Sequence, residues 1–286
     1  MANGLDPRLN AFRSDLADVA LKNKVEAACY VEARTARVVS HFCDALAEPR
    51  SDASLQAQFL YGDVLNVFER QNGYAWVQRK SDGYVGYVAE AGLGDVTGEP
   101  THMVLAPRTF LYSKPDLKSP RTGYRSMGSA LVVVDRATVR GTDYAILANG
   151  DAVISRHLMK IGEWQIDYVA VAETLLHTPY LWGGDTGFGI DCSGLVALSM
   201  RMCGRTVLRD SDMQMASIGR ELPQNLNELR RGDLVFWKGH VGMMRDAQTL
   251  LHANGHTMNV ALEPLVDAVD RIGYLYGKPV QLRRPD

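Results

Sequence analysis

Residues 180–194 read YLWGGDTGFGIDCSG, and the apolar run LVALSMRMCG follows as far as Gly204. Four glycines between residues 183 and 189 allow the backbone of this loop to approach a ligand closely. Asp191 has a short acceptor side chain that can cap a helix, and glycine is favoured just past a helix end. The pattern predicts a helix with Cys192 in its first turn, where the helix dipole favours a thiolate over a thiol. The alternative interpretation is an inert, buried cysteine.

Two histidines follow this helix in runs that are typical of β-strands. His240 lies in GHVGMM and His252 lies in LLHAN, and a three-residue loop at 245–247 would join the two runs as a hairpin. If Met244 faces Gln248, the same register places His240 directly opposite His252, with Cβ atoms about 4.5–5.5 Å apart on one face. A slip of one residue would break this pairing.

A cysteine and two histidines in this arrangement have the chemistry of a catalytic triad. Cys192 would be the nucleophile, and His240 would be the base that takes its proton and later protonates a leaving amine. His252 would orient His240, since such a base needs a third polar group that fixes its ring plane. Zinc is the alternative for these residue types, but a zinc site usually has further ligands at tight spacing. We expect no metal and no cofactor, and we expect His256 to be exposed.

The part of the chain before this region follows a different plan. Residues 1–25 contain one weakly amphipathic segment, which predicts a short helical arm. Residues 26–99 alternate short apolar runs with turn residues, including Asn72-Gly73 and Asp82-Gly83, and predict a small β-barrel. Residues 100–160 repeat this plan more weakly, and two copies of such a pattern indicate tandem domains.

Composition and charge indicate a globular chain and exclude several other classes. The 286 residues contain 31 basic and 33 acidic side chains, a poor electrostatic footprint for binding duplex DNA. No stretch approaches ~18 apolar residues, and the N-terminus does not read as a secretory signal. The four cysteines form no CxxC pair, which favours free thiols in a reducing compartment. We therefore expect a cytoplasmic protein with no nucleic acid, membrane or obligate protein partner.

Six motifs in one order resemble those of the NlpC-type cell-wall cysteine peptidases. The resemblance implies an α+β protein in which a papain-like domain at 161–286 follows two small bacterial Src-homology-3-like barrels, at 26–99 and 100–160. This order of domains is similar to that of the γ-D-glutamyl-L-diamino acid endopeptidases. The motifs are YLWGG (180–184), GIDCSGLV (189–196), LRDSDMQ (208–214), RGDLVFW (231–237), GHVGM (239–243) and LHAN (251–254).

The resemblance also implies a substrate and its contacts. Family members of this architecture cleave peptidoglycan stem peptides between D-glutamate and the diamino acid, and they require a free N-terminal L-alanine. The backbone N–H of Cys192 and the hydroxyl of Tyr180 would stabilise the oxyanion. A buried carboxylate would hold the substrate ammonium group, and the candidate contacts are Asp191, Ser193, Tyr84 and Glu48. The alternatives are a helix-capping role alone for Asp191 and an ordinary barrel position for Tyr84.

Two other functions stay open at this point. The same three residues could serve an amidase or acyltransferase that acts on another small amide or ester, with an amine or water as the acceptor. The chain could also be a non-catalytic protein that binds wall fragments. The leading expectation is a cysteine endopeptidase that acts on small muropeptides in cell-wall recycling, with either diaminopimelate or lysine as the diamino acid.

Overall fold

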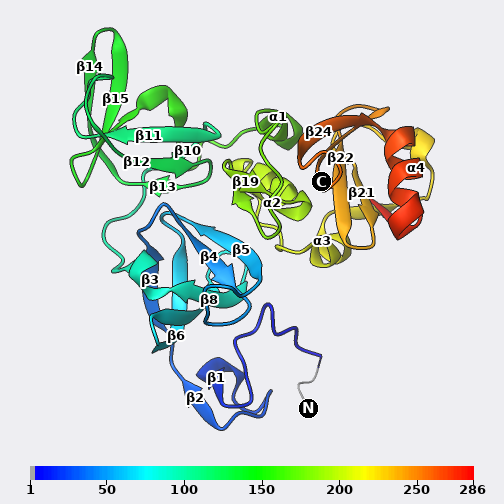
Figure 1. Ribbon diagram of the computed structural model, residues 1–286, viewed down its shortest axis with the longest axis horizontal. Helices are drawn as coiled ribbons and strands as arrows, with labels where there is room; N and C mark the ends of the chain where they lie inside the picture. Colours follow the sequence, from blue (N-terminus) through cyan, green and yellow to red (C-terminus); the bar gives the residue numbers. More distant parts are fainter. Residues whose placement is uncertain (1–3) are drawn as a thin grey trace. The chain divides into compact units, whose positions relative to one another are not determined.

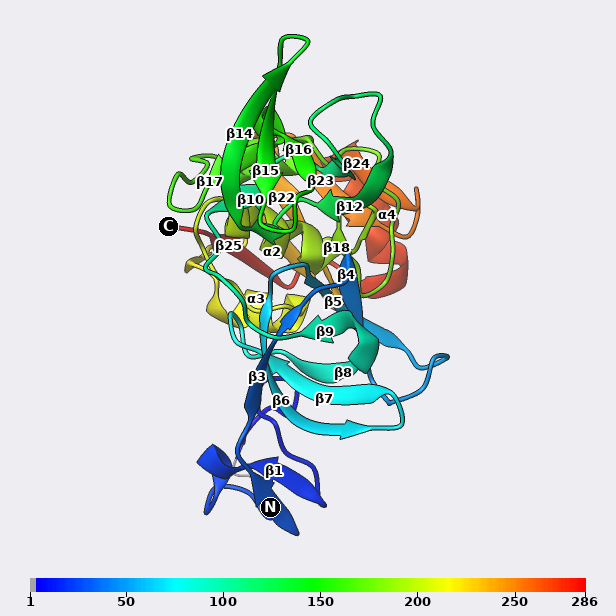
Figure 2. The same ribbon diagram turned by 90° about the vertical axis from the view of Figure 1, so that its left-hand side faces the viewer.

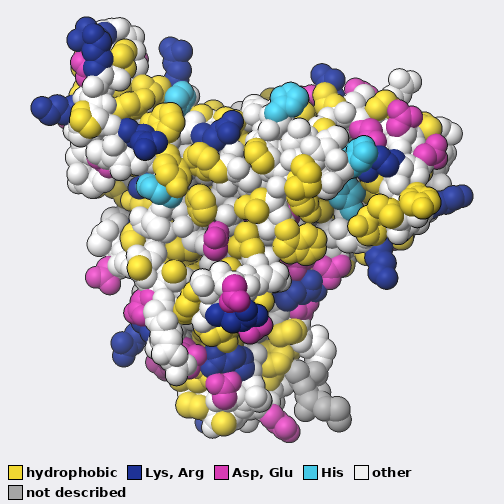
Figure 3. All heavy atoms as spheres, viewed as in Figure 1, with side chains coloured by type: hydrophobic (Ala, Val, Ile, Leu, Met, Phe, Trp, Pro, Cys, Tyr) yellow, Lys and Arg dark blue, Asp and Glu magenta, His cyan; other side chains and the backbone are white. Residues whose placement is uncertain are grey.

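The computed structural model describes residues 4–286. The chain divides into two compact units between Ile161 and Gly162, the first rich in strands and the second built from helices and strands (Figure 1). None of the helices in this described part has the length and apolar composition that a membrane crossing requires. On the face that Figure 3 shows, basic and acidic side chains are interspersed, in keeping with their nearly equal numbers.

Over residues 4–25 the arm contains no α-helix, so the helical arm predicted for residues 1–25 is wrong in this described part. β1 (Leu16–Asp18) pairs in parallel with β2 (Cys29–Val31), and η1 (Val19–Leu21) is a single 3-10 turn after β1. The physical reason is tertiary packing, because the apolar residues of the arm are drawn into contacts with the first barrel and with each other.

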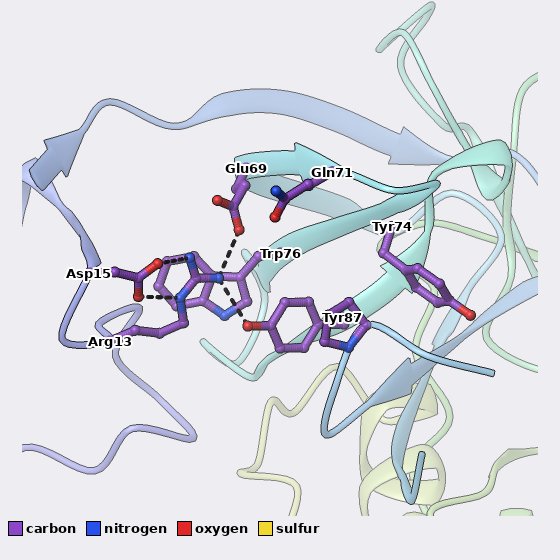
Figure 4. A pocket seen from close by; sticks show the side chains of 8 residues that line it. Arg13, Asp15, Glu69, Gln71, Tyr74, Trp76 and Tyr87 are labelled. Atoms are coloured by element: carbon purple, nitrogen blue, oxygen red, sulfur yellow. Dashed lines mark hydrogen bonds and ion pairs between the residues drawn. The ribbon is translucent and has the colours of Figure 1, made fainter. Parts of the chain in front are cut away.

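Arg13 fastens this arm to the barrel. Its guanidinium lies over the ring of Trp76 (Figure 4), and the distance from its central carbon to the ring centroid is 4.4 Å. The same guanidinium hydrogen bonds to Asp15, Glu69 and Tyr87. Ala11 and Leu16 pack close by against Trp76, so a cation–π contact, ion pairs and apolar burial all fix the arm in place.

The first barrel is a seven-stranded sheet in the order β5-β4-β8-β7-β6-β3-β9. Asn72-Gly73 forms the turn between β6 and β7 with φ values of 52° and 78°, as the sequence predicts. Figure 2 shows β6, β7 and β8 side by side. The elements are β3 (Arg34–Val38), β4 (Phe42–Leu46), β5 (Leu55–Leu60), β6 (Val64–Gln71), β7 (Tyr74–Arg79), β8 (Val85–Ala89), η2 (Glu90–Gly92) and β9 (Leu93–Gly94).

The next sixty residues use the same order of parts. The hairpin β14–β15 turns at Arg140-Gly141 with φ values of 54° and 74°, and a strand, a 3-10 turn and a short strand follow it, as they follow β6–β7. The strands form two sheets, β13-β10-β17 and β12-β11-β16-β15-β14. The elements are β10 (His102–Val104), β11 (Arg108–Tyr112), β12 (Arg121–Ser126), β13 (Ala130–Leu131), β14 (Val133–Val139), β15 (Thr142–Leu147), β16 (Ala152–Ile154), η3 (Ser155–His157) and β17 (Leu158–Lys160).

The second unit is built on a six-stranded antiparallel sheet in the order β20-β25-β21-β22-β23-β24. Its long helices α2 and α4 lie on either side of this sheet in Figure 1. The elements are α1 (Tyr168–Glu173), β18 (Asp185–Thr186), β19 (Gly189–Ile190), α2 (Cys192–Met202), α3 (Ser211–Ser217), β20 (Arg220–Leu222), η4 (Leu226–Glu228), β21 (Leu234–Trp237), β22 (His240–Met244), β23 (Thr249–Asn254), β24 (Asn259–Pro264), α4 (Leu265–Tyr276) and β25 (Gln281–Arg284).

The core of the second unit explains the position of α4. Met244 on β22 and Leu250 on β23 point to the same face and pack with Leu265 and Ile272 of α4. His240 and His252 have the same strand parity as Met244 and Leu250, so they belong to this face as well.

Candidate active site

Cys192 is the first residue of α2 and is buried, with 7% of its surface exposed. Asp191 caps the helix as predicted, because its Oδ1 accepts a hydrogen bond from the Gly194 amide at 2.7 Å. The amides of Val241 and Ser193 hydrogen bond to the sulfur and act to lower the pKa of the thiol. Since Val241 belongs to β22, the helix and the sheet meet at the sulfur.

The strands that carry the histidines separate close to Cys192. The ladder between β22 and β23 ends at the Met243–Leu251 pair, and α2 packs against both strands. His240 opens β22 directly after the Lys238-Gly239 turn, where Gly239 has a φ of 76°. Val241 lies past the end of this ladder, so its amide hydrogen bonds to the sulfur of Cys192 instead of to β23.

The structure brings the two histidines together, as the sequence predicts. Nε2 of His240 lies 2.9 Å from Nδ1 of His252, and the ring centroids are 5.2 Å apart with an interplanar angle of 64°. The expected register is nevertheless wrong, because Met244 lies opposite Leu250 instead of Gln248.

The side chain of Asp246 explains this shift. Its Oδ1 accepts hydrogen bonds from the amides of Gln248 and Thr249, both at 2.9 Å, so the loop is centred one residue later than predicted. Moving the loop by one residue shifts the pairing by two. Because side chains alternate faces with a period of two, His240 and His252 stay on one face and become diagonal neighbours.

Two residues that the sequence analysis missed continue this series of contacts. Nε2 of His252 lies 3.1 Å from Oε2 of Glu263 on β24. Arg271 on α4 holds both oxygens of Glu263, at 2.9 and 2.6 Å. These hydrogen bonds hold the pKa of Glu263 down at about 2, so the carboxylate is charged at neutral pH. The available sequence signal was the β23–β24 hairpin, in which Glu263 is a diagonal neighbour of His252.

Burial opposes charge on both Cys192 and His240. It raises the pKa of the Cys192 thiol to about 12 and lowers the pKa of His240 to about 3. Burial therefore opposes the thiolate that the helix start is predicted to favour, and the thiolate stays a prediction. Burial thus favours the uncharged forms of both side chains, and a transfer of the thiol proton to His240 as the sulfur attacks stays a prediction.

A buried ion network supports the loop that leads into α2. The Arg209 side chain is 1% exposed, and it lies 2.8 Å from Asp185 and 2.7 Å from Asp191. It also donates to the Ser193 hydroxyl at 2.8 Å, and Asp191 accepts a further bond from the Gly183 amide at 2.9 Å. Asp191 and Ser193 thus hold the helix start and the glycine loop together, and their direct contact with a substrate stays a prediction.

Tyr180 lies at the start of the glycine loop and is partly exposed. Its hydroxyl has no hydrogen-bond partner within residues 4–286. Burial, together with the negative charges that Cys192 and Asp191 can carry, raises the pKa of Tyr180, so the hydroxyl keeps its proton. A protonated hydroxyl without a partner is suited to donate to a substrate oxygen, and the oxyanion role stays a prediction.

The two candidate contacts from the first unit have other partners there. Tyr84 is 2% exposed and belongs to the apolar core of the first barrel, in line with the alternative interpretation. Glu48 is exposed, and its carboxylate lies 3.1 Å from Arg50. A substrate contact of either residue stays a prediction.

An aromatic side chain lies against the first of the two histidines. Trp237 is buried, and its ring centroid lies 5.7 Å from that of His240, so it packs beside the proposed base. His256 is exposed, as predicted. In the part of the chain that the structure describes, no group of three or more His, Cys, Asp or Glu side chains could hold a metal ion.

Two family models match the chain. The model of the NlpC/P60 family matches residues 177–270, a range that includes Cys192, His240 and His252. The model of the bacterial dipeptidyl-peptidase SH3 domain matches residues 46–93, which lie in the first barrel.

Relatives of known name match over much of the chain. A dipeptidyl-peptidase 6 of Lysinibacillus sphaericus is 26% identical over 245 residues, which cover 78% of this chain and 89% of that protein. A γ-D-glutamyl-L-lysine dipeptidyl-peptidase of Bacillus cereus is 27% identical over 238 residues, which cover 74% of this chain and 71% of that protein. A probable endopeptidase NlpC of Escherichia coli is 39% identical over 84 residues, 27% of this chain and 53% of that protein.

A solved structure shares the fold. The crystal structure of an NlpC/P60 family protein from Bacillus cereus superposes with a TM-score of 0.73 at 21% identity, covering 88% of this chain and 99% of that one. The likeness confirms the predicted α+β fold, with a papain-like domain behind an SH3 domain.

Proposed function

Since the chain carries an NlpC/P60 cysteine peptidase domain behind a bacterial SH3 domain, we propose that it cleaves cell-wall stem peptides between D-glutamate and the diamino acid. The observation that carries this proposal is the bond between His240 and His252, next to a cysteine whose sulfur is held by the same strand. The relatives named γ-D-glutamyl-L-lysine dipeptidyl-peptidase support the choice of bond.

The chemistry follows the order of the three side chains. Cys192 attacks the γ-carbonyl of D-glutamate while His240 takes the thiol proton, and a tetrahedral oxyanion forms. The Cys192 N–H, which has no acceptor within the first helical turn, and the Tyr180 hydroxyl would donate to this oxyanion. His240 then gives its proton to the leaving amine, and water hydrolyses the thioester that remains on Cys192.

The charges around the helix start favour a substrate with a free amino terminus. Arg209 is bonded to two buried carboxylates, those of Asp185 and Asp191, so acidic groups gather at the helix start. An ammonium group of the substrate would supply a further positive charge there. A dipeptide-releasing enzyme needs this kind of recognition of the amino end.

The state of the cysteines favours one cellular compartment for the reaction. Cys29, Cys43, Cys192 and Cys203 are all free thiols, the form that a reducing compartment maintains. We place the reaction in the cytoplasm on this ground, with small wall fragments as the substrate and cell-wall recycling as its purpose.

Blocking the amino terminus of the substrate is expected to slow cleavage by about 10²-fold, since a hydrogen bond to a charged group is worth about 1.5–3 kcal/mol. The measurement compares L-Ala-γ-D-Glu-meso-diaminopimelate with its N-acetyl form, and the L-lysine peptide with its own N-acetyl form. Mass spectrometry with an added amine distinguishes hydrolysis from acyl transfer. Equal rates for free and acetylated peptides would contradict recognition of the amino end.

Replacing Tyr180 with phenylalanine is expected to lower kcat by about 10²-fold and leave KM unchanged, because an oxyanion donor acts only in the transition state. Tyr274→Phe is the matched control, since Tyr274 is 90% exposed on α4. Steady-state kinetics on the free tripeptide measure both variants. A Tyr180→Phe enzyme with unchanged kcat would remove the hydroxyl from the oxyanion site.

A further inference from the structure

We propose that Glu263 sets the proton positions on both imidazole rings, so that Nδ1 of His240 is left unprotonated and can take the proton of Cys192. Glu263 would act through the two histidines and would not touch the substrate, so it is a positioning residue. The inference rests on the proposed role of His240 as the base. It concerns which nitrogen of each ring carries hydrogen, a property that the geometry of the triad alone leaves open.

The contacts form a diagonal path across three neighbouring strands. His240 lies on β22, His252 on β23 and Glu263 on β24, and Arg271 on α4 completes the path. In the register of β23 and β24, His252 pairs with Ala261, so Glu263 is its diagonal neighbour on the same face. The separations along the path are 2.9, 3.1 and 2.6 Å.

The direction of the hydrogen bonds follows from the carboxylate. An ionised carboxylate can only accept, so Nε2 of His252 must carry hydrogen and donate to Glu263. Nδ1 of a neutral His252 is then a lone pair and can only accept. Nε2 of His240, at 2.9 Å, must therefore carry hydrogen and donate to it. The remaining nitrogen of His240, Nδ1, has no hydrogen and is the basic atom.

The opposite direction would leave the enzyme without a base. If His252 carried hydrogen on Nδ1, it would donate to Nε2 of His240, and the hydrogen of His240 would lie on Nδ1. That ring could not take the thiol proton at Nδ1. For a neutral His252, a neutral orienting group at position 263 would permit both directions, whereas a charged carboxylate permits one.

Arg271 keeps Glu263 in the required state. Its two hydrogen bonds at 2.9 and 2.6 Å fix the carboxylate plane, and its charge favours the ionised form. His252 has no exposed surface, so no solvent contact competes with Glu263 for its Nε2 hydrogen.

The first test reads the ring nitrogens directly. In the full chain labelled with 15N at histidine, the nitrogen shifts distinguish protonated from unprotonated ring positions, and His240→Gln and His252→Gln variants assign the signals. We expect both rings to carry hydrogen on Nε2 in the native protein. We expect a mixture of both tautomers in Glu263→Gln, because an amide can donate as well as accept. Hydrogen on Nδ1 of His240 in the native protein would overturn the proposal even if the variant fails to fold.

The matched control is Glu173→Gln. Glu173 is also a carboxylate held by two arginines, at 3.1 Å from Arg231 and 2.8 Å from Arg245, but it lies on α1 away from the histidines. This variant is expected to leave the ring tautomers and kcat unchanged. Equal tautomers in native protein and Glu263→Gln would show that Glu263 only anchors α4.

The second test is kinetic. Glu263→Gln is expected to lower kcat by about 10- to 100-fold with KM unchanged. Losses of this size are typical when a residue that orients a metal-binding histidine is replaced, and we expect a similar loss for a catalytic one. In a His252→Gln background, the glutamine carbonyl can accept from His240 without Glu263, so adding Glu263→Gln should cost nothing further. Additive losses would contradict the proposal. The nitrogen shifts need no substrate, so a wrong substrate assignment would leave them as expected.

Discussion

Replacing Cys192 with alanine is expected to abolish peptide cleavage, with kcat falling on the order of 10⁶-fold, as in other triads that lose their nucleophile. The sulfur is the atom that would form the thioester, and alanine offers no nucleophile in its place. The side chain is small and buried, so its loss is expected to leave the fold intact. The measurement is product release from L-Ala-γ-D-Glu-diaminopimelate, with thermal unfolding of the same sample.

Cys203→Ala is the control for this variant. Cys203 is half-buried at the other end of the same helix, where it is the C-cap residue of α2. It should keep full activity. Turnover by the Cys192→Ala enzyme at more than a trace of the native rate would contradict the assignment of the nucleophile.

Replacing Arg209 with methionine is expected to destabilise the chain by about 3–5 kcal/mol, because removing one partner of a buried ion pair leaves an uncompensated charge. Here two carboxylates, of Asp185 and Asp191, would lose their shared cation in a site with almost no solvent contact. Asp191 also caps α2 and holds the Gly183 amide, so the position of Cys192 depends on the same network. Urea unfolding followed by circular dichroism measures the effect.

Arg205→Met tests whether loss of charge alone has this effect. Arg205 is exposed and lies four residues before Arg209 in the same connection. It is expected to change stability by less than about 0.5 kcal/mol, as surface substitutions usually do. A similarly small change for Arg209→Met would show that the buried network contributes little to the fold.

The two histidines lie together as predicted even though the predicted loop between their strands is wrong. The predicted loop is misplaced by one residue, because the side chain of Asp246 accepts hydrogen bonds from the amides of Gln248 and Thr249. The shift changed the partner of each histidine but kept both on one face. A prediction that depends only on strand parity tolerates this error, whereas one that depends on the opposite residue does not.

The N-terminal arm shows the opposite case. Its amphipathic pattern was weak, and the packing of Ala11 and Leu16 against Trp76 decided its conformation. Tertiary packing likewise decides the position of Tyr84 in the core of the first barrel. In both cases the competing interaction comes from residues far away in the chain, which a local pattern does not report.

The amino-acid sequence by itself determined the local features of this protein. Asp191 and Gly204 delimit the helix of Cys192, Asn72-Gly73 closes a hairpin, and the parity of His240 and His252 gives them a common face, because each depends on residues within a few positions or on strand alternation. Only the tertiary structure decided the buried environment. The pKa shifts of Cys192 and His240, the Arg209 network and the link from His252 to Glu263 and Arg271 arise where separate elements exclude water together. Desolvation and ion pairing depend on that assembly, and no single segment of the sequence contains it.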